Sequence, residues 1–295
     1  LSREEVINKI NVFPVPDGDT GTNLALTLHA VLQSLRARPD AHAGQLLTRI
    51  ADAALDGARG NSGAILAQFL LGIGDRAGHL PTITASDFAQ AVAGGATYAR
   101  DALAEPREGT VLTVVSDFAH EIGELVGRHG VSDFRALFSR GLERARASLE
   151  ATRDQLESLR KANVVDAGAM GFVELLAGIV HYLETGELAE DDAVSVIRED
   201  EATAGEEQDL SHRYCTECVV SGESVDRRHL REKLSAVGSS LVVAGTQRKV
   251  KVHVHVNDPA EVFRIAAGFG AVSGEKADDM QRQQDAAHHS GRRSV

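Results

Sequence analysis

The sequence predicts a multidomain chain in which an all-α domain is followed by a smaller α+β domain. Apolar residues recur every three or four positions through the first part of the chain, acidic residues crowd the next stretch, and from Tyr214 apolar residues alternate every second position. We therefore expect a helical domain at 1–185, an acidic linker at 186–210, an α+β domain at 211–276 and a polar tail at 277–295.

The first domain is expected to be a sequence of amphipathic helices packed as an antiparallel bundle or barrel. Capping residues support two of the helix starts, at Ser86-Asp87 and Ser132-Asp133. After a short helix at the beginning of the chain, the apolar stripes start at Leu24, Leu46, Ile65, Phe88, Val111, Phe134 and Phe172.

The second domain combines strands and helices in a short chain segment. Its third strand alternates strictly, so its four valines would share one face of a sheet. The predicted strands are 213–220, 240–244 and 249–256, and the predicted helices are 225–234 and 260–269.

Composition limits the functional classes. The net charge is −12 and the basic residues are dispersed, which argues against a nucleic-acid-binding protein. Cysteine occurs only 2 times, too few for a disulfide scaffold, and this predicts a reducing, cytoplasmic location. The sequence has no run of about 18 apolar residues, so we expect no membrane span.

The segment Asn11–Asn23, with the sequence NVFPVPDGDTGTN, concentrates residues of special chemistry. Its prolines prevent helix and its glycines permit unusual backbone shapes. Asp17 and Asp19 lie two residues apart in a tight turn and can direct both carboxylates at one cation, with Mg²⁺ or Ca²⁺ favoured by oxygen ligands. A helix expected to begin near Thr22 would offer free backbone amides to phosphate beside that cation.

The alternative for this segment is an Asp-rich turn whose side chains cap the following helix. The density of Pro, Gly and Thr around the two carboxylates favours the cation and phosphate site. An EF-hand loop is excluded because no further acidic ligands follow at the spacing of that motif.

Further motifs, taken with Asn11–Asn23, carry a resemblance over nearly the whole chain. The sequence resembles the DAK2 family, the nucleotide-binding domain of dihydroxyacetone kinases, in the form found in the ATP-binding subunit of bacterial fatty-acid kinase. Its second part resembles the middle domain of that subunit. The segments that carry the resemblance are GARGNSG at 57–63, EPREGT at 105–110, VDAGAMG at 165–171, YCTE at 214–217 and KVHVH at 251–255.

The resemblance implies a barrel of eight antiparallel helices with ATP bound at one end. It implies that Asp17 and Asp19 bind Mg²⁺, with the amide oxygen of Asn11 as a third candidate ligand. The acceptor implied is a fatty acid held by a separate DegV-like lipid-carrier protein, so that the product is an acyl phosphate. The nucleotide contacts implied are Thr20, Gly21, Thr22, Asn23, Asn61, Ser62, Gly63, Gly109, Thr110, Asp166 and Gly168.

The sequence departs from the family pattern in three places. The third metal-binding Asp of the dihydroxyacetone branch is replaced by Val12, next to Asn11. Ala169 and Met170 replace the Gly-Gln pair common in the fatty-acid branch, which affects the expected nucleoside contacts. The C-terminal domain that engages the lipid carrier in that branch lies beyond the last residue of this sequence.

Phosphoryl transfer requires an acceptor in line with the transferred group and neutralised phosphate charge, and little covalent chemistry from the protein. We expect no nucleophile from this chain, and a carboxylate acceptor is already ionised near neutral pH. Arg59 and Arg107 lie in the glycine loops and are candidates for stabilising the transferred phosphoryl group. The alternative is that both are solvated surface residues.

A zinc site is the second metal hypothesis. Alternation places His253 and His255 on the face opposite the valines, where Cys215 on another predicted strand could join them. Cys218 faces the other way along its strand and is assigned to the core. The alternative is a pair of exposed strand histidines beside two buried thiols.

Three functional classes remain open from the sequence. The first is the ATP-binding subunit of a fatty-acid kinase, acting in lipid metabolism. The second is a nucleotide-binding regulator without kinase activity, and the third is a glycerone-type kinase acting on a small sugar. A homodimer formed through the second domain is a further expectation.

Overall fold

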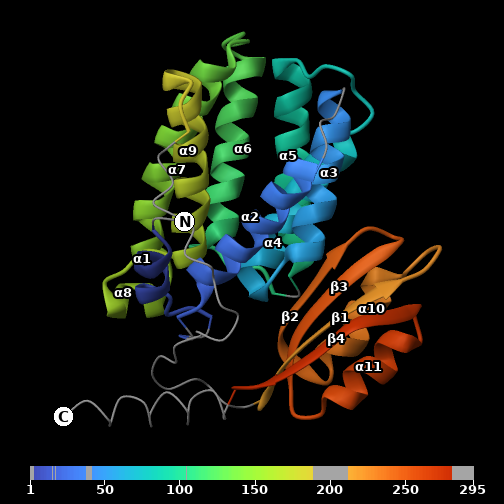
Figure 1. Ribbon diagram of the computed structural model, residues 1–295. Coiled ribbons are helices and arrows are strands. Elements are labelled where there is room, and N and C mark those ends of the chain that lie inside the picture. Colours follow the sequence, from blue (N-terminus) through green and yellow to red (C-terminus); the bar gives the residue numbers. More distant parts are fainter. Residues whose placement is uncertain are drawn as a thin grey trace.

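A computed structural model shows a helical domain with a smaller sheet domain beside one of its ends (Figure 1). Asp17 and most of the expected acidic linker lie outside the part of the chain that the structure describes. The described residues are 3–14, 16, 18–37, 42–103, 105–188 and 212–280.

Long and short helices alone build the body of the first domain. Two short helices, α1 (Glu4–Lys9) and α8 (Glu157–Ala162), accompany the long ones. The long helices are α2 (Thr20–Ala37), α3 (Ala43–Gly57), α4 (Gly60–Ala77), α5 (Ala85–Ala102), α6 (Val111–Gly127), α7 (Phe134–Gln155) and α9 (Ala167–Thr185).

The long helices form a closed circuit. Each packs on the next from α2 to α7, α7 packs on α9, and α9 returns to α2, while α1 packs against both α9 and α2. Phe118 and Ile122 of α6 are among the side chains buried at the centre of this barrel, together with Phe172 of α9. The prediction of a helical barrel is therefore confirmed.

Helix α9 is long and apolar enough to cross a membrane, by length and composition alone. In the structure it packs on α1, α2, α6 and α7. Phe172, Val173 and Leu176 belong to the buried core of the barrel. The apolar face of this helix is thus used within the domain.

The second domain is a four-stranded antiparallel sheet with the strand order β2-β3-β1-β4. Helices α10 and α11 pack on one face of the sheet (Figure 1). The elements are β1 (Tyr214–Ser221), α10 (Arg227–Ser235), β2 (Gly238–Gly245), β3 (Lys249–Val256), α11 (Pro259–Ala267) and β4 (Ala271–Asp279). The predicted small α+β domain is confirmed.

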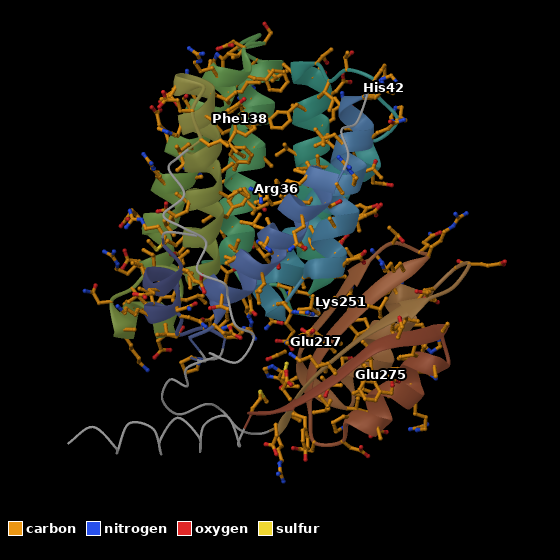
Figure 2. The ribbon with its side chains drawn as sticks, viewed as in Figure 1. Arg36, His42, Phe138, Glu217, Lys251 and Glu275 are labelled. Carbon is orange, nitrogen blue, oxygen red and sulfur yellow. The ribbon has the colours of Figure 1, made fainter. Side chains whose placement is uncertain are left out.

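The alternation of β3 divides the sheet into two chemically different faces. Val250, Val252 and Val254 are fully buried in the core beneath the helices, with Cys218 of β1. Lys251 and the two histidines of β3 point to the opposite face, which lies toward the helical domain (Figure 2). The expected separation of Cys218 from Cys215 is observed.

Strand β4 was not predicted from the sequence. It pairs with β1 at the edge of the sheet, and most of its residues are exposed, so no apolar alternation marks it. Gly274 has a positive φ of 61° where the pairing with β1 is irregular. Because β4 continues to Asp279, the boundary expected between residues 276 and 277 is wrong.

The two domains are in direct contact. Leu103, just after α5, forms an isolated β-bridge with Val242 of β2. Val242 and Ala244 of β2 also pack with Leu55 and Ala64 of the helical domain in one buried apolar cluster. The sheet is therefore held against the ends of α3, α4 and α5.

Candidate functional site

Four motif segments of the sequence lead directly into helices. Helices α2, α4, α6 and α9 begin at Thr20, Gly60, Val111 and Ala167. The first amides of a helix have no partner inside the helix, and the helix dipole makes this end favourable for anions. The functional question is whether these four ends share one space.

The first two segments are in contact. The Ser62 hydroxyl donates to the Thr20 carbonyl oxygen at 3.4 Å. Gly60 has a positive φ of 55°, and a Cβ atom there would lie 2.4 Å from Nδ2 of Asn23. Glycine is therefore required at position 60 by both backbone shape and space. Asp19 precedes α2, and its carbonyl oxygen accepts the first helical hydrogen bond, from the Asn23 amide, at 2.8 Å.

The last two segments are joined by Asp166. Its Oδ1 atom accepts from the amides of Val111 and Ala169, at 2.9 Å and 2.8 Å. Burial raises the pKa of Asp166 to about 6, against the opposing effect of these two hydrogen bonds. Asp166 thus caps α9 and ties its start to the start of α6.

A narrow cavity of about 30 Å³ brings residues of all four segments together. Its lining includes Leu24, Ser62, Val111 and Gly168. Thr22, Asn23, Gly63 and Thr110 occupy the first turns or cap positions of the same helices. The structure therefore gathers the expected nucleotide segments at one end of the barrel.

The remaining predicted residues of this site differ in their surroundings. Asn11 is buried between α1 and α2, and the Oδ1 atom of Asn61 is buried without a hydrogen-bond partner among the described residues. Arg107 is 62% exposed and pairs with Glu105 at 2.8 Å, which favours the interpretation as a solvated surface residue. Arg59 directs its guanidinium toward Glu217 of the sheet, at 3.9 Å.

The site has the features that a bound nucleotide with Mg²⁺ requires. Helix amides and the unpartnered oxygen of Asn61 offer hydrogen-bonding capacity that the described part of the protein does not use. Gly109 also has a positive φ, of 80°, in the turn before α6. Asp19 supplies a carboxylate of the type that Mg²⁺ prefers, beside the first turn of α2. The described residues fit the ligand that the sequence predicts.

A second cluster lies on the sheet face that points toward the helical domain. One candidate ligand atom from each of Cys215, His253 and His255 lies within 4.8 Å of the others. Zinc bound to nitrogen and sulfur would hold neighbouring ligand atoms about 3.5 Å apart, so small side-chain movements would close the cluster around an ion. Both histidines are buried, at 5% and 8% exposure, so the alternative of exposed strand histidines is wrong.

The two histidines have different electrostatic surroundings. Burial, followed by the charge of His253, lowers the pKa of His255 to about 3. Burial also opposes charge on His253, but contacts with Cys215 and Glu217 raise its pKa well above the usual value. A metal at this cluster would have to displace the proton of His253, since only a neutral imidazole is a ligand.

Sequence reasoning missed Glu217. Its carboxylate lies 3.1 Å from Nδ1 of His253 and 3.6 Å from Nζ of Lys251. Burial opposes its ionisation, but the hydrogen bond and charge of His253, with Lys251 and Arg59, lower the pKa of Glu217 to about 2. Its position two residues after Cys215 on the same strand was the available signal, because residues i and i+2 share a face.

Comparison with known proteins agrees with this geometry. The family model described as the DAK2 domain matches residues 14–181, which include all four nucleotide segments. The chain belongs to the DAK2 domain family. A second model, described as the middle domain of FakA-like fatty acid kinase proteins, matches residues 211–287 and so follows the DAK2 domain directly. Together the two matches indicate a FakA-like kinase subunit.

Curated relatives share both domains. Protein YloV of Bacillus subtilis is 32% identical over 290 residues, which cover 94% of this chain and 52% of that protein. The uncharacterized protein SSP1546 of Staphylococcus saprophyticus is 32% identical over 289 residues, covering 95% of this chain and 52% of that protein. The chain thus spans about half the length of the curated relatives it matches.

Proposed function

We propose that this chain is the ATP-binding part of a kinase that transfers the γ-phosphoryl group of ATP to a fatty acid presented by a separate lipid-carrier protein. The observation that carries the proposal is the gathering of four helix N-termini, each preceded by a family motif, around one space. The middle-domain match supports the fatty acid as acceptor over a small sugar.

In this proposal the chain binds and orients ATP, and neutralises charge as the phosphoryl group moves. Asp17 and Asp19, with Asn11, would hold Mg²⁺, which supplies Lewis-acid neutralisation of the phosphates when bound. Thr20, Thr22, Asn23, Asn61 and Ser62 would bind phosphate through amides and side chains at helix starts. No nucleophile of this chain takes part, because the acceptor carboxylate attacks the phosphorus directly.

Asp166 contributes by position in this mechanism. One carboxylate oxygen already accepts two buried amides, so the residue fixes the spacing of the loops before α6 and α9. Gly109, Thr110 and Gly168 lie in those loops and would close over the nucleoside. Their contacts depend on a spacing that Asp166 sets.

The test is ATP turnover by the purified chain with a carrier protein loaded with fatty acid, with the empty carrier and with dihydroxyacetone. Acyl phosphate formed only with the loaded carrier is the expected result. Phosphorylated dihydroxyacetone would support the glycerone-type alternative instead. Nucleotide binding without transfer to either acceptor would support the non-catalytic regulator.

The proposal includes zinc at Cys215, His253 and His255. The wild-type chain purified without added chelator is expected to carry about one zinc per chain by elemental analysis, and Cys215→Ser is expected to lose it. Cys218→Ser is the matched control, since Cys218 lies in the apolar core and burial, then the charges of Glu275 and Glu217, raise its pKa to about 12. Zinc absent from the wild type, or retained by Cys215→Ser, would contradict this assignment.

A further inference from the structure

Strand β3 and the connection between α3 and α4 run beside each other in matched two-residue steps. Lys249 pairs with Asp56 at the end of α3, and the Lys251 ammonium donates to the Ala58 carbonyl oxygen. The next inward residue of β3, His253, contacts Glu217, whose Oε1 atom accepts from the Gly60 amide at 3.4 Å. The sheet therefore touches this connection at three successive points.

The inner two contacts are buried, unlike the first. The side chains of Glu217 and Lys251 are 8% and 7% exposed, whereas those of Asp56 and Lys249 are 57% and 43% exposed. Buried charged groups that lose a partner leave an uncompensated charge, so such contacts are held firmly. Exposed ion pairs contribute little by comparison.

Gly60 lies between the sheet and the first nucleotide segment. On one side its amide donates to Glu217, and on the other side its Cα packs so closely on Asn23 that a side chain would collide. Its φ of 55° is also the bend from which α4 starts. The position of Glu217 thus fixes where α4 begins and where Asn61 and Ser62 lie.

A carboxylate beside a phosphate-binding loop would repel the nucleotide if it stood alone. Here Lys251 and Arg59 lie within 4 Å of the Glu217 oxygens, and both carry positive charge. The cluster therefore brings an anion to the loop without leaving net negative charge there. This arrangement suits a group that holds backbone rather than one that binds phosphate.

We propose that Glu217 and Lys251 are positioning residues that hold the loop from Ala58 to Asn61 in its nucleotide-binding shape, so that the sheet of the middle domain forms part of the nucleotide site. The inference rests on the proposed function for its ligand. It adds that two residues of the second domain set nucleotide affinity in the first, without touching the nucleotide.

The experiment compares Glu217→Ala, Glu217→Gln and Lys251→Met with the control Lys249→Met, all in the full chain. Mg²⁺–ATP affinity is measured by calorimetry, backbone amide exchange over residues 58–63 by mass spectrometry, and metal content by elemental analysis. We expect Glu217→Ala and Lys251→Met to weaken affinity by about tenfold and to speed exchange in 58–63. Glu217→Gln, which keeps an acceptor for Gly60 but loses the charge, should lie between these variants and wild type.

The control separates a local effect from a general loosening of the interface. Lys249→Met removes a contact on the same strand and should leave affinity and exchange near wild type. Wild-type affinity in Glu217→Ala and Glu217→Gln, or equal weakening in Lys249→Met, would overturn the inference while leaving the proposed function intact. Failure of the wild-type chain to bind Mg²⁺–ATP would instead overturn the proposed function, and the inference with it. Metal content equal to wild type shows that an altered affinity does not arise at the histidine cluster.

Discussion

Asp19→Asn is expected to lower the Mg²⁺-dependent affinity for ATP by about 100-fold, close to 2.7 kcal/mol. The substitution keeps the size of the side chain and leaves in place the Asp19 carbonyl oxygen that accepts from Asn23. It removes a negative charge from the proposed Mg²⁺ site, and Mg²⁺ binds weakly to neutral oxygen ligands alone. Asp17→Asn should act in the same direction.

Calorimetric titration with ATP, in Mg²⁺ and in excess chelator, measures the effect. Asp133→Asn is the matched control, because Asp133 also precedes a helix and accepts from the Ala136 amide at 3.0 Å. It changes net charge equally but lies at the far end of α6 from Val111, about 25 Å away by helix length. Unchanged affinity in Asp19→Asn would remove this residue from the metal site, and equal losses in both variants would point to a general charge effect.

Much of the fold could be predicted because periodicity reports burial directly. The apolar stripe from Val111 to Leu125 became a buried face of α6, and the valines of β3 became the core of the second domain. Ser132-Asp133 was expected at a helix start, and Asp133 caps α7. At α5 the cap is Thr84, with Asp87 returning a hydrogen bond three residues later, so the signal at Ser86-Asp87 was displaced by two residues.

Two kinds of feature could not be read from the sequence. Strand β4 has alternating exposure too weak to give a pattern, since only pairing with β1 holds it in the sheet. The contact of Glu217 with Gly60 joins residues 157 positions apart, and neither residue type announces a partner. Strand parity placed Glu217 on the correct face, but only the packing of the two domains shows what that face touches.

Gly72→Ala is expected to destabilise the helical domain by about 2 kcal/mol, although alanine is the better helix former. A Cβ atom at Gly72 would lie 2.7 Å from the Gly94 carbonyl oxygen and 2.7 Å from Cα of Gly95. Both are backbone atoms of α5, so no side-chain rotation can relieve the contact. Helices α4 and α5 would have to separate, and the packing between them would be lost.

Gly123→Ala is the matched control because it makes the same change within α6, where a Cβ atom would meet nothing within 4 Å. Here only the helix propensity and the reduced freedom of the unfolded chain change, so we expect stabilisation by about 0.5–1 kcal/mol. Urea unfolding followed by circular dichroism measures both variants. The opposite signs are the test, because the same residue change is made in two helices and only the close approach of α4 and α5 differs. Equal stabilisation of both variants would mean that the glycines at this crossing do not set the distance between the helices.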